Sequence, residues 1–211
     1  MRIYYQSVGR NGLLLLNVPP DQRGMIAAED SARLMEFAAA LQSAFAQDLA
    51  QNSVEIKTSH VRGVKSPIIQ NLKNRAQKSS LSANEQAYGV ANLLDTNYHS
   101  YWAVDDTVRK AWVMLEFDEP ESFNRVMLQE YIPLGQRVSK FHIEIMLPDG
   151  KWQTVATETT IGYKRIVLLP VCTTKAVRIC IDESLACPVL NRVALYKDEV
   201  FIPSIATSTQ E

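Results

Sequence analysis

Hydrophobic and polar residues alternate with a period of two along much of the chain between residues 111 and 181. Such alternation places one face of a β-strand against a core and the other toward solvent. The turn signal Pro148-Asp149-Gly150 separates two of these runs. Short strands with no helical pattern between them predict an antiparallel β-sandwich. The apolar positions are Val113, Leu115 and Phe117, then Phe141, Ile143, Ile145 and Leu147, and finally Val177, Ile179 and Ile181.

The first fifty residues follow a different pattern. Leu13 to Val18 is a nearly unbroken apolar run, typical of a strand that is buried on both faces in a parallel sheet. Beyond Pro19-Pro20, apolar residues recur at helical spacing and predict an amphipathic helix from about Glu29 to Leu49. One strand and one helix cannot bury their own apolar faces, so we expect this βα unit to pack on another structure or to self-associate. The apolar face of the helix consists of Leu34, Phe37, Leu41 and Phe45.

The composition mainly excludes certain classes of protein. The 211 residues are 46% hydrophobic and 21% charged, as in an ordinary globular protein. A net charge of -1 provides no field to attract nucleic acid, and no apolar run approaches the roughly 20 residues that span a bilayer. The first residues do not show the pattern of a secretory signal peptide. If the chain is part of a longer one, this says nothing about where the protein is located. Cys172, Cys180 and Cys187 are expected to be free thiols, with one disulfide left open.

Two sets of motifs resemble known families. Residues 7 to 26, SVGRNGLLLLNVPPDQRGMI, resemble the last barrel strand and following loop of the family 29 glycoside hydrolases, the α-L-fucosidases. The segments NLLDTNYHSYWAVDD, FNRVMLQEYIPLGQRV, TTIGYKRI and CPVLNRVALYK resemble the discoidin module (F5/8 type C, galactose-binding-like) that many bacterial members carry. The resemblance implies the C-terminal region of a bacterial α-L-fucosidase. Residues 1–50 would be the terminal strand and helix of an incomplete (β/α)8 barrel, 51–200 a discoidin-type jelly roll, and 201–211 a polar tail.

The resemblance also implies that the parent protein hydrolyses terminal α-L-fucosides with retention, using two carboxylates across the sugar. No position in this chain matches the nucleophile motif of the family. The pairs Asp105-Asp106 and Asp118-Glu119 are interpreted as solvated turn residues, and Asp21 has no partner carboxylate in sequence. We therefore predict that the chain has no catalytic residues and is inactive alone.

Discoidin-type modules commonly hold a calcium ion in the loop that begins here at Asp95, so the resemblance implies a structural calcium site. Asp95, Asn97 and Ser100 offer the hard oxygen ligands that calcium prefers. The family usually adds a glutamate before the last strand, where this chain has Arg192. The alternative is that Asp95 caps the turn.

Sugar binding requires exposed aromatic faces beside polar side chains. The candidates are Tyr98, His99 and Tyr101 in one loop, with Tyr163 and Arg165 in another, and the expected ligand is a fucosylated or galactosylated glycan. The three tryptophans are expected to pack the sandwich, and Glu130 and Arg137 to fix the loop between them.

Two functions remain open. The first is an accessory region of a secreted or periplasmic bacterial fucosidase, which binds carbohydrate or supports the rest of the barrel. The alternative is a free-standing discoidin-like lectin or adhesion module, which would leave residues 1 to 49 unexplained. That alternative predicts exposed apolar spikes on one set of loops, and the sequence shows none clearly.

Overall fold

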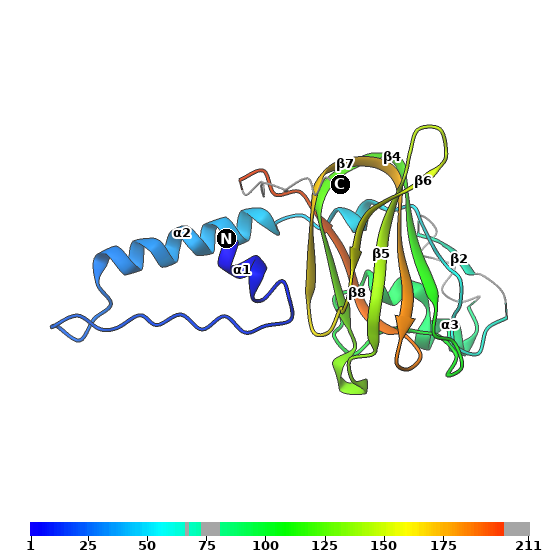
Figure 1. Cartoon of the computed structure of the whole chain (residues 1–211), viewed down its shortest axis with the longest axis horizontal. Coiled ribbons are helices and arrows are strands. Elements are labelled where there is room, and N and C mark those ends of the chain that lie inside the picture. The colour runs from blue at the N-terminus through cyan, green and yellow to red at the C-terminus, as the bar shows by residue number, and fades with distance from the viewer. Residues whose placement is uncertain (66–67, 73–80, 201–211) are drawn as a thin grey trace, which may run out of the picture.

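The computed structural model describes residues 1–65, 68–72 and 81–200. Within this part, a β-sandwich is joined to an extended N-terminal segment, residues 1–48, that projects away from it and is called the arm below (Figure 1). The predicted polar tail at 201–211 lies outside the described residues, as does part of the polar stretch between Lys65 and Glu85.

The sandwich consists of antiparallel strands arranged in two layers. One layer has the order β2-β1-β4-β7-β5-β6, and β8 pairs with β4 and β3 in the other. Because β4 and β7 are long, each contributes its two halves to different layers, and a register shift between Glu116 and Glu121 marks the bend. The strands are β1 (Glu55–Thr58), β2 (Ile68–Asn71), β3 (Trp102–Ala103), β4 (Ala111–Glu130), β5 (Val138–Met146), β6 (Trp152–Glu158), β7 (Arg165–Ser184) and β8 (Val189–Tyr196).

Burial confirms the predicted alternation. In each of the three runs the predicted inward residues are buried except Leu147, which is half-buried, and they form one hydrophobic core. Of the three tryptophans, only Trp102 is fully buried, where its indole N–H donates to the His60 carbonyl at 2.9 Å. Trp112 of β4 and Trp152 of β6 are half-buried, so of the three tryptophans expected to pack the sandwich only Trp102 belongs to its buried core. Trp152 instead lies under the guanidinium of Arg178, 4.3 Å from its ring centroid.

Residues 12 to 19, which include the predicted strand at 13 to 18, are extended without a hydrogen-bonded ladder, and the chain before them forms the short helix α1 (Arg2–Gln6). A strand requires partners for its N–H and C=O groups. Within the described residues no strand pairs with this segment, so its side chains stay outside any core, and Leu13 and Leu15 are 89% and 80% exposed.

The predicted amphipathic helix is present as α2 (Ala28–Ala44), but it ends at Ala44 instead of Leu49. Phe45 leaves the helix and packs its ring edge-on against Tyr196 of β8, with centroids 4.9 Å apart. The Asp48 carboxylate then accepts the Ala50 N–H and begins a new helical turn. The remaining helices are η1 (Leu49–Asn52), α3 (Ala83–Tyr88), η3 (Val90–Leu93) and η4 (Ile132–Leu134).

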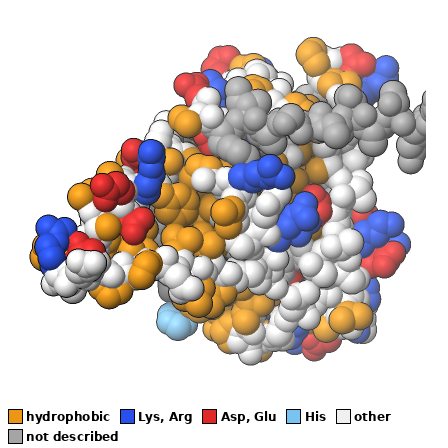
Figure 2. Space-filling view, turned by 60° about the vertical axis from the view of Figure 1, so that its left-hand side comes forward, with side chains coloured by type: hydrophobic (Ala, Val, Ile, Leu, Met, Phe, Trp, Pro, Cys, Tyr) orange, Lys and Arg blue, Asp and Glu red, His pale blue; other side chains and the backbone are white. Residues whose placement is uncertain are grey.

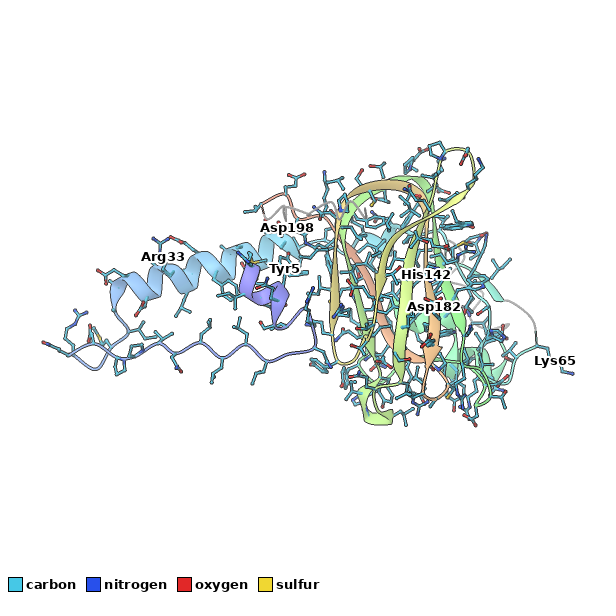
Figure 3. The ribbon with its side chains drawn as sticks, viewed as in Figure 1. Tyr5, Arg33, Lys65, His142, Asp182 and Asp198 are labelled. Atoms are coloured by element: carbon cyan, nitrogen blue, oxygen red, sulfur yellow. The ribbon has the colours of Figure 1, made fainter. Side chains whose placement is uncertain are left out.

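A buried polar contact fixes the arm to the sandwich. The Tyr5 hydroxyl of α1 donates to the Asp198 carboxylate at 2.7 Å, and Figure 3 labels both residues. The Arg125 guanidinium of β4 lies over the Tyr5 ring. All three side chains are buried. Burial, reinforced by the hydrogen bond to Asp198, raises the pKa of the Tyr5 phenol well above its usual value, so the hydroxyl remains a donor.

Candidate functional site

The loop that follows η3 borders a shallow depression on the sandwich. Its volume is about 200 Å³, and we call it the loop depression. Residues from the loop meet side chains of β4 and of β8 here, because these two strands are neighbours in the second layer. The lining residues are Asp95, Thr96, Asn97, Tyr98, Met127, Gln129, Asn191 and Arg192.

The polar groups predicted to hold calcium are engaged in hydrogen bonds that shape the loop. The Asp95 carboxylate accepts from the Asn97 N–H at 2.9 Å and from the Ser100 hydroxyl at 2.6 Å and 2.7 Å. The Asn97 side-chain oxygen accepts from the His99 N–H at 3.1 Å. An aspartate that accepts a backbone N–H two residues ahead is a turn-forming Asx motif. This geometry favours the alternative in which Asp95 caps the turn.

Arg192 occupies the position at which the family usually supplies an anionic ligand. Its guanidinium donates to the Asp95 carbonyl at 2.7 Å and to the Asp48 carboxylate at 2.7 Å. A calcium ion at this loop would face a fixed cation instead of a carboxylate, and one backbone oxygen is already bound by that cation. The residues present therefore fit a calcium ion poorly.

The loop depression combines an exposed aromatic ring with polar side chains. Tyr98 is 43% exposed at its rim, beside the exposed His99, whose ring lies 5.8 Å from that of Tyr98. Among the described residues, the Asn191 side-chain oxygen is buried without a hydrogen-bond partner, while its amide nitrogen lies 3.4 Å from the Tyr98 carbonyl. Unpaired buried acceptors are rare in native structures and require an explanation, such as a ligand or a bound water.

Tyr101, the third aromatic candidate in the loop, packs inward. Its ring stacks on Tyr131 with centroids 4.5 Å apart and an interplanar angle of 18°, and it also contacts Tyr88. Burial raises the pKa of its phenol. This packing gives Tyr101 a supporting role under the loop instead of a face open to a ligand.

In the second candidate loop, one predicted residue is exposed and the other is buried. Tyr163 is 53% exposed, and its carbonyl accepts from the Gln129 side chain at 3.0 Å, which connects it to the loop depression. Arg165 is only 9% exposed and forms an ion pair with Glu158 of β6. Arg165 is therefore a structural residue, contrary to its placement among the exposed sugar-binding candidates.

Glu130 organises the loops at this end of the sandwich. Its carboxylate accepts the backbone N–H groups of Arg137, Val138 and Gly162 at 2.6 to 2.9 Å. The Arg137 guanidinium donates instead to the Leu134 and Cys187 carbonyls. Both residues fix the loop as predicted, although through backbone groups instead of a mutual ion pair.

The candidate carboxylates outside the loop depression also have structural contacts. Asp105 accepts the Gly63 N–H at 2.7 Å, and Asp106 binds the Arg62 guanidinium through both oxygens. Arg62 holds the pKa of Asp106 below its usual value. Asp21 similarly pairs with its neighbour Arg23. These contacts agree with the interpretation of Asp21, Asp105 and Asp106 as turn residues. Asp118 and Glu119, also predicted to lie in a turn, instead fall within β4 at its register shift, so that prediction was wrong for this pair.

Sequence reasoning missed Gln129 and Asn191, which reach the loop depression from β4 and β8. The only signal was that each is the first of two polar residues that follow apolar residues in a strand segment, VMLQE and VLNRV. Their proximity to residues 95–98 depends on strand pairing, which a single sequence does not show.

An antiparallel sandwich with two long bent strands and polar loops at one end defines a discoidin-like β-sandwich module. The F5/8 type C domain family matches residues 75–188, and the chain belongs to this family.

The relatives are α-L-fucosidases, which confirms the predicted resemblance to the C-terminal region of a family 29 fucosidase. The chain is 35% identical over 218 residues to putative alpha-L-fucosidase 1 of Oryza sativa subsp. japonica, covering 99% of this chain and 38% of the relative. It is 33% identical over 200 residues to alpha-L-fucosidase 1 of Arabidopsis thaliana, covering 93% of this chain and 35% of the relative. The chain thus spans little more than a third of the length of these relatives.

Solved structures give the same result. A putative alpha-L-fucosidase from Bacteroides thetaiotaomicron superposes with a TM-score of 0.78 and 30% identity, over 93% of this chain and 39% of that one. A Ruminococcus gnavus GH29 fucosidase in complex with fucose gives a TM-score of 0.78 at 26% identity, over 93% of this chain and 36% of that one. Among the described residues, no helix is both long and apolar enough to cross a membrane.

Proposed function

We propose that this chain is a non-catalytic accessory region of an α-L-fucosidase. In this proposal the arm packs against the catalytic barrel and the loop depression binds a glycan. The observation that carries the proposal is the arm, which projects away from the sandwich and exposes apolar side chains (Figure 1). The matches to the fucosidase relatives include the arm, because they cover 99% and 93% of this chain.

The exposed side chains of the arm support the barrel contact. Ile3, Leu13, Leu15 and Met35 are each more than 60% exposed, and Figure 2 shows hydrophobic side chains grouped on the arm and where it meets the sandwich. Contiguous exposed apolar surface on a protein marks a contact site. The other face of the arm is already used, since Tyr4 packs on Phe37 and Phe45. The exposed face is therefore the one available to a barrel.

The composition of the loop depression supports glycan binding. An exposed tyrosine ring provides an apolar platform for the C–H face of a sugar, and amide groups pair with its hydroxyls. Tyr98, Gln129 and Asn191 supply this combination around a small, shallow depression, which suits one terminal sugar residue. We infer a fucosylated or galactosylated glycan as the ligand, and a secreted or periplasmic location for the parent enzyme.

A glycan array with fucosylated and galactosylated ligands tests the binding part. We expect the wild-type chain to bind, and Tyr98→Ala and Gln129→Ala to lose most of the signal. Val171→Ala is a matched control, because Val171 is similarly exposed but lies on β7, away from the depression. If the folded wild-type chain gives no signal on the array, the glycan site is overturned. Only the proposed packing of the arm against the barrel would then remain.

The non-catalytic part is tested with a nitrophenyl α-L-fucoside. We expect no release of nitrophenol above the blank, because the candidate carboxylates described above are bound to neighbouring N–H and guanidinium groups. Turnover that survives repurification of the chain would overturn this part of the proposal.

One observation favours a second candidate, the free-standing adhesion module. Leu134 and Leu185 are exposed on two adjacent loops, which are joined by the hydrogen bond from the Leu185 N–H to the Arg137 carbonyl at 2.8 Å. The adhesion-module alternative requires exposed apolar side chains on neighbouring loops, and these two leucines meet that requirement. Sedimentation with phosphatidylcholine–phosphatidylserine vesicles tests it. Binding by the wild-type chain that Leu185→Ser abolishes would support the module, and no sedimentation would reject it.

A further inference from the structure

A second cluster of chemically active side chains lies on the outer face of β5 and β7, apart from the loop depression. His142 and Cys180 are directly opposite each other in the antiparallel ladder, and Glu144 is opposite Arg178. Side chains in such register project to the same side of the sheet and lie close together. The candidate ligand atoms of His142, Glu144 and Cys180 all lie within 4.8 Å of one another.

Asp182 orients the histidine ring in this cluster. The Nδ1 atom of His142 lies 2.8 Å and 3.0 Å from the two carboxylate oxygens of Asp182, and Figure 3 shows both residues on the sandwich. A carboxylate only accepts hydrogen bonds, so Asp182 holds a proton on Nδ1. Nε2 is then directed away from Asp182 and is the nitrogen available to a ligand. Metal-binding histidines are commonly oriented by a carboxylate in this way.

The Nε2 atom faces a second acceptor. It lies 3.5 Å from Oε1 of Glu144, while Oε2 of Glu144 is bound by Arg178 at 2.6 to 2.7 Å. When Nε2 carries no proton, its lone pair and Oε1 of Glu144 face each other across this gap, and a metal cation between them would bind both, while Arg178 stays on the other oxygen of Glu144. The Cys180 sulfur lies 3.6 Å from Glu144 Oε2 and completes a nitrogen, oxygen and sulfur set.

We propose that His142, Glu144 and Cys180 form a binding site for a divalent transition-metal ion of the zinc class. Three protein ligands of these types, with a fourth position for water, are typical of zinc. The sulfur and imidazole donors select zinc or cobalt over calcium and magnesium, which prefer oxygen. Upon binding, the Cys180 thiol proton leaves to solvent and the sulfur coordinates as thiolate.

Solvent reaches this side of the sheet. An open groove of about 450 Å³ runs beside the cluster and is lined by His142, Asp182, Lys140 and Thr154, among others. The groove borders the cluster at His142 and Asp182, and the three proposed ligands are themselves half-buried instead of sealed in the core. A metal here would link β5 to β7, in addition to the backbone ladder between them, and this role is independent of the proposed function.

Cobalt titration of the metal-free 211-residue chain tests the site. A thiolate ligand produces an intense ultraviolet charge-transfer band, and four-coordinate cobalt produces visible d–d bands. We expect both bands to saturate at one equivalent and to disappear when zinc displaces cobalt. Absence of the charge-transfer band in the folded wild-type chain overturns the proposal.

The variants separate this site from adventitious binding. Cys180→Ser should abolish the charge-transfer band and His142→Ala should weaken cobalt binding severely, whereas the matched controls Cys172→Ser and His60→Ala should behave as wild type. Asp182→Asn should weaken binding about 10- to 100-fold while keeping the band, since it acts through His142. A band retained in Cys180→Ser overturns the site. If Cys180→Ser does not fold by circular dichroism, His142→Ala and Asp182→Asn decide the question.

Discussion

Arg192 of β8 and Asp48 at the end of the arm form an ion pair with 2.7 Å between the guanidinium nitrogen and the carboxylate oxygen. The two residues are 144 positions apart in the chain, and their side chains are only 16% and 10% exposed. The same Asp48 carboxylate accepts the N–H groups of Ala50 and Leu195. This one aspartate therefore connects the arm, η1 and the last strand.

We predict that Asp48→Ala lowers the free energy of unfolding by about 3 kcal/mol, because it leaves a largely buried guanidinium and two N–H groups without their acceptor. Urea unfolding followed by circular dichroism measures the change. The matched control is Glu36→Ala, which breaks an exposed pair with Arg33 and should cost roughly 0.5 kcal/mol or less. Equal costs for the two variants would contradict the prediction.

Tyr5→Phe should destabilise the junction between the arm and the sandwich by about 1 to 2 kcal/mol, since it removes the only donor group of Tyr5 from the buried Asp198 carboxylate. Tyr4→Phe is the control, because the Tyr4 ring packs on Phe37 and Phe45 and that packing is kept. Thermal unfolding of the two variants beside wild type makes the comparison. A Tyr5→Phe variant as stable as Tyr4→Phe would contradict the assigned role of the hydrogen bond.

The raised pKa of Tyr5 also predicts a dependence on pH. In the unfolded chain the phenol ionises near its ordinary pKa of 10.0, whereas in the folded protein burial and Asp198 keep it protonated to higher pH. The stabilisation is therefore complete below pH 10 and declines as the pH rises above it. Wild type should lose more stability than Tyr5→Phe between pH 9 and pH 11, and parallel losses would contradict this.

The loop that begins at Asp95 yields a prediction about calcium. Adding Ca²⁺ to the metal-free protein should leave its melting temperature unchanged, because Ser100 and backbone N–H groups already satisfy the Asp95 carboxylate, and Arg192 places a cation beside it. Differential scanning calorimetry with Mg²⁺ as the reference ion tests this. A specific rise with Ca²⁺ that Asp95→Asn abolishes would restore the calcium site at Asp95, Asn97 and Ser100.

The sandwich was predictable because burial determines which side of each strand is apolar. Alternation in β4, β5 and β7 is visible in the sequence and holds in the structure, where Leu115, Ile143 and Ile179 are buried. A strand at residues 13 to 18 was not predictable in the same way. Its apolar run indicates that the segment suits a buried environment. Strand formation also requires neighbouring strands to pair with, and the described residues do not supply one for this segment.

The candidate site was predictable only in part, because its members come from three distant segments. The sequence indicated the loop with Tyr98 and His99, and both lie exposed at one rim. It did not indicate that Arg165 would be buried by Glu158, since that contact depends on how β6 and β7 meet. Nor did it indicate the Arg192 contacts, which require the arm to return to β8.

The arm makes the last prediction, which concerns self-association. Leu13 and Leu15 project into solvent, and burying each against another surface is worth about 2 kcal/mol. In the absence of a barrel, we expect the wild-type chain to associate through the arm as its concentration rises, and the double variant Leu13→Ser/Leu15→Ser to remain monomeric by sedimentation velocity. The melting temperature of the variant should equal that of wild type, because neither leucine belongs to the core.

Leu185→Ser is the control for this experiment, because Leu185 is also 80% exposed but lies in the loop between β7 and β8. It should associate as wild type does if the arm is the contact surface. If Leu185→Ser loses association and the double variant does not, the chain associates through the loops instead of the arm. The adhesion-module alternative requires that result. A wild-type chain that stays monomeric at high concentration would show that the exposed leucines do not by themselves recruit a second copy, and the argument for a barrel contact would lose its physical basis.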